Sequence, residues 1–184
     1  MACISKLASA IAYDCDTGLV GLHSAIIINR ADIASFTVDK STGTVSGVTL
    51  VSGAKAYKID TVKRSLVLSS ALKVNDGAPN AYSHSATLVC TGEMDAEMRA
   101  VASAFSNGSF VIMAKAPTVP TLKAADPRVY GLYYGMSATA VEQNSHDNGA
   151  WATYTFETPE NVIGEDLLAI TGEDYDALYA AAVG

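Results

Sequence analysis

Few residues in this sequence have the types and spacing that catalysis requires. The three histidines, His23, His84 and His146, are isolated from one another. His84 has Ser83 and Ser85 as neighbours in a strand-like run, but adjacent side chains of a strand point to opposite faces, so a serine nucleophile with a histidine base is not indicated. The sequence contains neither a phosphate-binding glycine loop nor a Gly-x-Ser-x-Gly elbow. We therefore expect a protein that is not an enzyme and binds no cofactor.

Metal and thiol chemistry is equally weak in this sequence. His146 and Asp147 are adjacent and such a pair can bind a metal, but a turn rich in Asn, Asp and Gly forms for local backbone reasons, so a solvated turn is the favoured interpretation. Cys3, Cys15 and Cys90 show no Cys-x-x-Cys spacing. We expect no metal site and three free thiols, which fits synthesis in a reducing compartment.

Carboxylates are the most conspicuous chemical feature. The chain of 184 residues has 12 Lys and Arg against 19 Asp and Glu, a net charge of −7, and every basic residue lies at or before Arg128. The part after Arg128 therefore carries negative charge only. Paired carboxylates can act as acid and base in a cleft, but a solvated acidic stretch or a contact with a basic face of another copy is a simpler use. We predict that Glu157, Glu160, Glu165 and Asp166 take part in such a contact with another copy of the chain.

Composition limits the class of protein. The chain is 49% hydrophobic and only 17% charged, so it has enough apolar residues to fold into a core. No apolar run reaches the roughly 20 residues of a membrane helix, and the acidic balance argues against a general nucleic-acid binder. The first residues lack the pattern of an export signal. We expect one β-rich structural domain over 1–184, with a possible N-terminal arm at 1–15 and an acidic C-terminal segment at 160–184.

Short β-branched runs separated by turn residues predict a mainly β fold of the sandwich or barrel type, with one central packed helix and short terminal helices. Ser52-Gly53 suits a tight hairpin between two of the strands. The central helix is predicted from apolar spacing and the stop at Asn107-Gly108, and the last helix begins after Thr171, a capping residue. The strands are expected at 24–29, 33–38, 44–51, 54–60, 63–73, 82–91, 110–115, 129–136 and 151–157, and the helices at 5–11, 94–105 and from 172 onward.

The loop between 73 and 82 predicts a long hairpin. An Asp-Gly pair followed by Pro predicts a turn for two physical reasons. Gly adopts positive φ, and Pro has no N–H to donate to the hydrogen bonds of a β-ladder. We predict that the tip of this hairpin takes part in assembly through Asn75, Asp76, Gly77 and Pro79.

Three stretches carry a resemblance to a known group of proteins: residues 21–33, the hairpin around 75–77, and 130–136 followed by 148–151 and the next strand. The chain resembles small structural proteins of tail modules in Bacteroidetes phages and prophages, and its layout is similar to phage tail tube proteins. The resemblance implies a homo-oligomeric ring, commonly a hexamer, in which the long hairpins join into one inner barrel. Stacked rings would conduct DNA without binding it specifically, and other phage tail or head proteins would be partners. The expected location is the virion, after assembly in the cytoplasm of the host bacterium.

Two other functions remain open. The chain could be a capsid decoration or head–tail connector (completion) protein, which would form small closed oligomers. It could also be a carbohydrate-binding β-sandwich module with Tyr133, Tyr134, Trp151 and Tyr154 as a stacking platform, although aromatic residues at strand spacing more often belong to a core.

Overall fold

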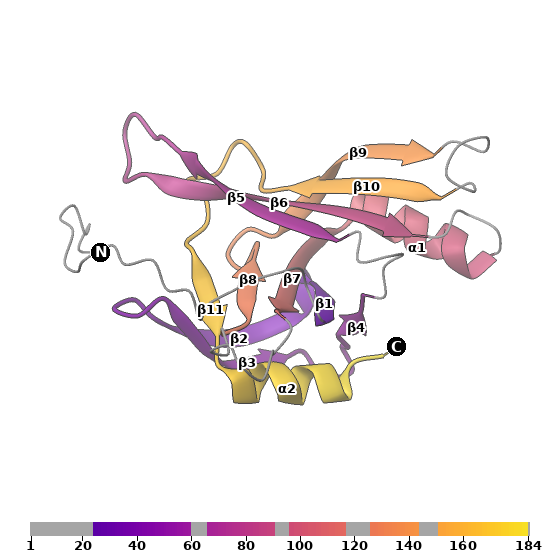
Figure 1. Cartoon of the computed structure of the whole chain (residues 1–184), viewed down its shortest axis with the longest axis horizontal. Coiled ribbons are helices and arrows are strands. Elements are labelled where there is room, and N and C mark those ends of the chain that lie inside the picture. Colours follow the sequence, from indigo (N-terminus) through magenta and orange to yellow (C-terminus); the bar gives the residue numbers. More distant parts are fainter. Residues whose placement is uncertain (1–23, 60–65, 91–95, 117–125, 144–150, 184) are drawn as a thin grey trace.

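The computed structural model describes residues 24–59, 66–90, 96–116, 126–143 and 151–183, which form two β layers with one helix at the side and one below (Figure 1). These residues contain eleven strands and two α-helices. The predicted mainly β fold, of the sandwich or barrel type with few helices, is therefore confirmed.

The lower layer is built around β1 (Ser24–Asn29) and β7 (Ser109–Lys115), which pair antiparallel along their whole length. A short 3-10 helix at Arg30–Asp32 connects β1 to the next strand. The other edge of β7 leads through the sheet in the order β8 (Arg128–Tyr130), β11 (Leu168–Ile170), β3 (Thr44–Leu50) and β2 (Ile33–Asp39), while β4 (Tyr57–Lys58) pairs with β1.

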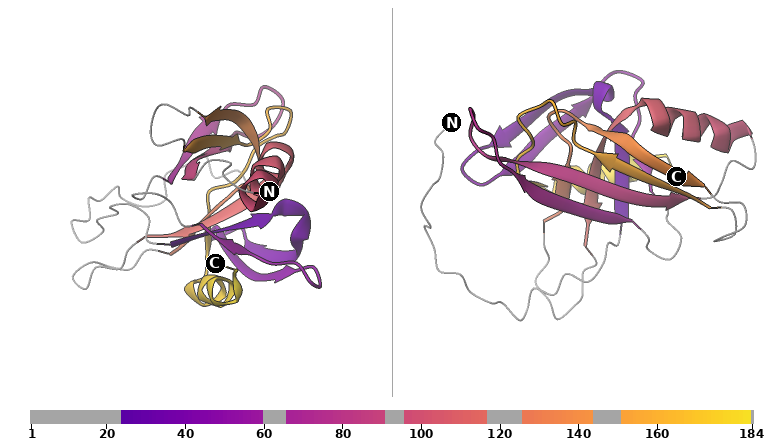
Figure 2. Two further views of the ribbon diagram at one scale, coloured as in Figure 1. Left: turned by 90° about the vertical axis from the view of Figure 1, so that its right-hand side faces the viewer. Right: turned by 90° about the horizontal axis from the view of Figure 1, so that it is seen from above.

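The upper layer contains four antiparallel strands. Their order is β9 (Met136–Gln143), β10 (Ala152–Glu157), β6 (Ala81–Cys90) and β5 (Val67–Lys73). The layers are joined because the start of β7 pairs with β9 at Ser109 and Phe110. Viewed from the side, this layer lies above the lower strands and α2 (Gly172–Ala181) lies below them (Figure 2).

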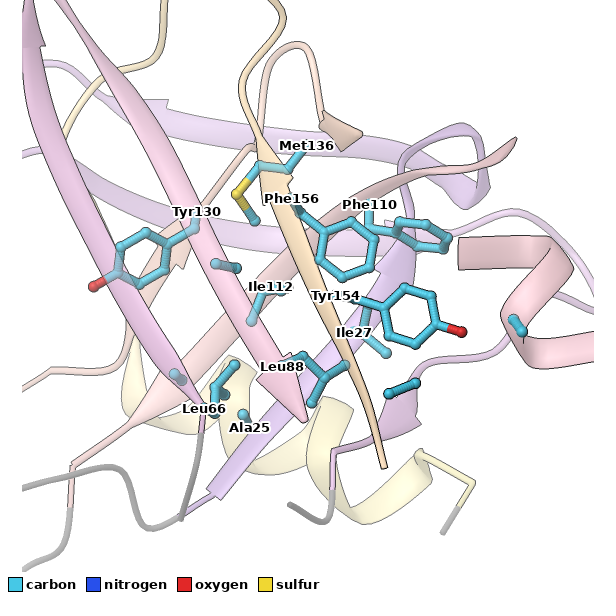
Figure 3. Close-up of a cluster of buried hydrophobic side chains, with 14 residues drawn as sticks. Ala25, Ile27, Leu66, Leu88, Phe110, Ile112, Tyr130, Met136, Tyr154 and Phe156 are labelled. Carbon is cyan, nitrogen blue, oxygen red and sulfur yellow. The ribbon is translucent and has the colours of Figure 1, made fainter. Parts of the chain in front are cut away.

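Two separate cores follow from the alternation of side chains along β1 and β7. Ile27 and Ile112 belong to the cluster between the layers, whereas Ile26 and Met113 belong to the cluster over α2. The first cluster is shown in Figure 3, and it is completed by Phe105 of α1 (Ala96–Asn107), which packs against it. Because both faces of β1 and β7 are covered, their nearly continuous apolar sequence is explained.

The acidic end of the chain is part of the fold. Thr171 caps α2 by accepting a hydrogen bond from the Asp174 amide (3.3 Å), as predicted. The Asp174 carboxylate also accepts from the Gly47 amide of β3 (3.0 Å), and Asp176 forms a 2.7 Å ion pair with Lys115 at the end of β7. These contacts fasten α2 under the lower layer.

The hairpin predicted at Ser52-Gly53 is wrong. A turn does form there, with the Ala54 amide donating to the Val51 carbonyl (2.9 Å) and Gly53 at φ 85°. The following segment, however, contributes only β4, which pairs with β1 and not with β3, while β11 occupies the beginning of the other edge of β3 at Thr44 and Val45. A tight turn signal in the sequence does not reveal which strand the chain pairs with next.

The single strand predicted over 129–136 is also wrong. It is divided into β8 and the start of β9 by a turn whose flanking residues, Gly131 and Gly135, both have positive φ. The extent of β9 to Gln143 and the whole of β11 were not predicted. The long hairpin, α1, β10 and α2 are confirmed, with end residues that differ by a few positions.

Other predictions cannot be compared with the structure. The helix at 5–11, the arm at 1–15 and residues 63–65 lie outside the described residues. Among the helices of the described ranges, none is both long and apolar enough to span a membrane.

A substitution at Phe105 tests how α1 packs against the core. Its ring contacts those of Phe110, Tyr154 and Phe156 edge to face, with centroids 5.2–5.6 Å apart. Phe105→Ala is expected to lower the free energy of unfolding by about 3 kcal/mol, because it leaves a cavity at the junction of α1 and β10. Urea denaturation measures this, with Arg99→Ala on the exposed side of the same helix as the control. Equal losses in the two variants would show that Phe105 does not anchor α1.

Candidate functional site

The tip of the β5–β6 hairpin is held in place by Asn75. Its side-chain amide donates to the Pro79 carbonyl (2.9 Å) within the loop and to the Ile163 carbonyl (3.0 Å) of the segment after β10. Asp76, Gly77 and Pro79 are exposed to solvent. Asn75 thus has a structural role, while the other three predicted residues form an accessible tip.

The hairpin and the acidic segment, which the sequence presents as separate features, adjoin one another. The Lys73 ammonium donates to the carbonyls of Glu160 (2.8 Å) and Val162 (2.6 Å). Tyr82 and Glu165 form an antiparallel bridge with two backbone hydrogen bonds of 2.8 Å. All eight predicted assembly residues therefore lie on or beside one hairpin. Glu157, at the end of β10, does so because it is paired with Ser85 of β6.

The four predicted carboxylates differ in exposure. Glu157 and Glu160 are exposed, and their side chains form no ion pair with other described residues. Asp166 is half-buried and accepts from the Tyr133 hydroxyl (3.1 Å), and Glu165 is 0% exposed. Glu165 is thus not part of a surface that another copy could contact, and only Glu157 and Glu160 remain fully available for such a contact.

The Glu165 carboxylate instead stabilises the turn between β8 and β9. Its two oxygens accept from the backbone amides of Tyr133 (2.9 Å) and Tyr134 (2.8 Å). Burial raises the pKa of Glu165, and the two amides and the nearby Arg30 oppose that rise. Arg30 also donates from Nε to the Tyr133 carbonyl (3.1 Å). Glu165 thus connects two parts of the fold. Its backbone pairs with Tyr82 of the upper layer, and its carboxylate binds the turn that links the layers.

The Tyr133 hydroxyl donates a hydrogen bond to the Asp166 carboxylate, which lies next to Glu165 in the chain. Burial raises the pKa of Tyr133 to about 12, and the neighbouring Asp166 and Glu165 carboxylates act in the same direction. A phenol that stays protonated can donate to Asp166 at all physiological pH values but cannot act as a base. Its role here is structural.

His84 lies on the inner face of β6, next to the same turn. It is 1% exposed, its Nδ1 accepts from the Gly131 amide (3.0 Å), and its ring stands edge-on to Tyr130 with centroids 5.2 Å apart. Burial lowers the pKa of His84 to about 4, although the Asp166 charge opposes this shift. The imidazole is therefore neutral at pH 7, and since Nδ1 is an acceptor, the proton is on Nε2.

A cavity of about 370 Å³ opens between the layers beside His84. Its walls come from four places in the chain: the β2–β3 turn, the β5–β6 hairpin, the region of β8 and the region of β11. The lining residues are Thr42, Gly43, Ser70, His84, Asp126, Arg128, Val129, Tyr130, Leu167, Leu168 and Ala169.

The described ranges contain no group of three or more His, Cys, Asp or Glu side chains that could hold a metal ion. Cys90 is half-buried, and burial raises the pKa of its thiol, which keeps it unreactive. Cys3, Cys15, His146 and Asp147 lie outside the described residues.

The comparisons with known proteins give no match. No family model, curated protein or solved structure matches this chain. Its function must therefore be argued from the geometry of its own residues.

The sequence patterns did not predict the roles of several of these residues. His84 was considered only as a base for a neighbouring serine, and residues 131–135 were predicted as part of a strand, although two glycines four residues apart are a turn signal. The aromatic platform for sugars is not assembled, because the Tyr154 side chain is in the core and Tyr133 is tied to Asp166.

Glu165 can be tested against Glu160, its exposed neighbour in the same segment. Glu165→Ala is expected to lower the free energy of unfolding by about 3 kcal/mol, because two backbone amides lose their acceptor. Glu165→Gln, which retains one acceptor oxygen, should lose less, and Glu160→Ala should lose less than about 0.5 kcal/mol. Urea denaturation at pH 7 measures all three, and similar stabilities for the two alanine variants would contradict the role of Glu165.

His84 makes the stability depend on pH. Its pKa is 6.5 in the unfolded chain and about 4 in the fold, so the unfolded state binds more protons between these values, and stability is lost as pH falls from 6.5 towards 4. The loss attributable to His84 is about 2 kcal/mol at pH 5 relative to pH 7. His84→Asn retains an acceptor for the Gly131 amide but does not titrate. Denaturation curves at both pH values should therefore show a smaller loss for this variant, and parallel losses would contradict the assignment.

Proposed function

We propose that this chain is a self-assembling phage virion structural protein, a tail tube subunit that forms stacked rings. The observation that carries the proposal is the pair of open strand edges at the two ends of the sheet order. Among the described strands, β5 pairs only with β6 and β2 only with β3. An unpaired edge offers a row of backbone donors and acceptors to another chain.

The edge of β5 lacks the usual protection against pairing. Val67 and Leu72 are each 60% exposed on this strand. Lys73, whose charge would otherwise discourage an approaching strand, is folded back onto the Glu160 and Val162 carbonyls. An exposed apolar edge without a free charge is suited to burial against a neighbour.

The occupied edges determine which strands can meet between copies. Both edges of β6 are used, one by β5 and the other by β10, Thr158 and Glu165. The hairpin thus offers β5 alone, so the proposed contact pairs β5 of one copy with β2 of the next. Such a head-to-tail contact closes into a ring when its rotation divides a full turn. A hexamer is the stoichiometry that the resemblance suggests.

Stacking of rings would use the exposed charges. Glu157 and Glu160 lie beside the hairpin, and their carboxylates form no ion pair with other described residues. The basic residues of the sequence all lie at or before Arg128. Contact between these unlike surfaces would give the stack a polarity, and exposed acids would keep a passing DNA from adhering.

The β5 edge is tested with the double variant Val67→Asp/Leu72→Asp. Both side chains are exposed, so the fold should persist while charges at the edge block pairing between copies. We expect rings or tubes from the wild-type protein and monomers from the variant, by sedimentation and negative-stain microscopy. Val141→Asp, a substitution at another exposed valine (46%) on β9, is the control and should assemble normally.

The same experiment can overturn the proposal. A wild-type protein that stays monomeric at high concentration, without rings or tubes even after seeding, would exclude a tube subunit. Small closed oligomers that never stack would favour a capsid decoration or connector protein. Normal assembly of the double variant would show that β5 is not the contact.

A further inference from the structure

The tip of the β5–β6 hairpin presents exposed apolar side chains beside exposed acids. The hairpin loop and the segment after β10 lie side by side, because Asn75 donates to the Ile163 carbonyl (3.0 Å). On these adjoining segments, Val74 is 69% exposed and Ile163 is 53% exposed. Apolar surface rimmed by charge is typical of interaction sites. We call this surface the tip patch, and its members are Val74, Asp76, Glu160 and Ile163.

A second surface, along β4, has the same composition with the opposite charge. Val183, which follows α2, is bridged to Tyr57: the Lys58 amide donates to the Val183 carbonyl (2.8 Å), and the Val183 amide donates to the Ala56 carbonyl (2.9 Å). The side chains of Tyr57 and Val183 are exposed, and so are two lysines of the same segment. We call this surface the β4 patch, and its members are Lys55, Tyr57, Lys58 and Val183.

The charges of both patches are available to a partner. None of the four charged side chains forms an ion pair with another described residue. The Lys58 ammonium lies 5.0 Å from the centre of the Tyr179 ring, a contact that leaves its charge unneutralised. Opposite charges that surround apolar side chains on two surfaces favour contact between those surfaces in one orientation.

The two patches lie too far apart to meet within one copy. Figure 1 shows the loop between β5 and β6 at the upper left of the molecule and β4 at the lower right. A contact between them therefore joins two copies through different surfaces, which is a head-to-tail arrangement. Such a contact leaves one patch free at each end, so it can continue from copy to copy.

We propose that the tip patch of one copy binds the β4 patch of a copy in the next ring. The apolar side chains of the two patches face one another in this contact, and the acids face the lysines. The inference rests on the proposed self-assembly, and it names the basic surface that receives Glu160 when rings stack. The contact is separate from the one within a ring, because neither patch contains a residue of β5 or β2.

Charge reversal on one patch at a time tests this contact. One variant of the full chain is Asp76→Lys/Glu160→Lys, and the other is Lys55→Glu/Lys58→Glu. All four side chains are exposed, so both variants should fold and form single rings, but each presents two patches of like charge. Mixed in equal amounts, the variants carry complementary patches again. We expect the critical concentration for tubes to rise roughly tenfold or more for each variant alone, and to return to within about twofold of wild type in the mixture.

A matched control separates the contact from a general effect of charge. Glu97→Lys/Glu142→Lys replaces two exposed acids, on α1 and β9, and changes the net charge by the same amount as the first variant. It should form tubes as the wild type does. Sedimentation velocity and negative-stain microscopy distinguish monomers, single rings and tubes in all samples.

The outcomes separate this contact from the proposed function. Tubes from either reversed variant alone, or none from the mixture, would overturn the contact and leave the tube subunit standing. Monomers in place of single rings would put the contact within a ring and overturn the assignment to stacking. Wild-type filaments without rings, lost in both variants and restored in the mixture, would support the contact and refute the ring. A wild-type protein that stays monomeric would overturn both.

Discussion

The structure depends on the burial of both faces of β1 and β7. Their side chains alternate between two clusters, so a single sheet formed around these strands would expose apolar surface on one side or the other. The upper layer with α1 covers one face, and α2 covers the other. Each peripheral element can therefore be understood as a cover for this pair, and the remaining strands extend the sheets away from it.

Because both faces are covered, backbone polar groups become buried where the chain passes between the layers. The turn between β8 and β9 makes this passage, and a buried turn has backbone amides that no ladder satisfies. His84 accepts from Gly131, and Glu165 accepts from Tyr133 and Tyr134, so two side chains of the upper layer and its flanking segment supply what the turn lacks. The most polar part of the interior is thus the turn that connects the two layers.

Local patterns allowed much of this fold to be predicted, and the exceptions have one cause. The alternation in β10, the hairpin around Asp76-Gly77 and the cap at Thr171 are all decided within a few residues, and each was confirmed, although Gly77 does not adopt the positive φ on which the hairpin prediction relied. The pairing of β4 with β1 and the insertion of β11 are decided by distant segments competing for strand edges. Burial of Glu165 likewise depends on a turn some thirty residues away, so an acidic stretch that looks solvated in sequence provides a core group.

The position of β11 has a consequence for how the protein folds during synthesis. This strand lies between β3 and β8 and is parallel to β3, yet it is synthesised long after both. A nascent chain emerging from the ribosome therefore has a gap in its lower layer until residue 170 has been translated, and α2 can cover that layer only afterwards. Such late, non-local closure slows folding, and it also means that prematurely terminated chains lack the strand that joins β3 to β8.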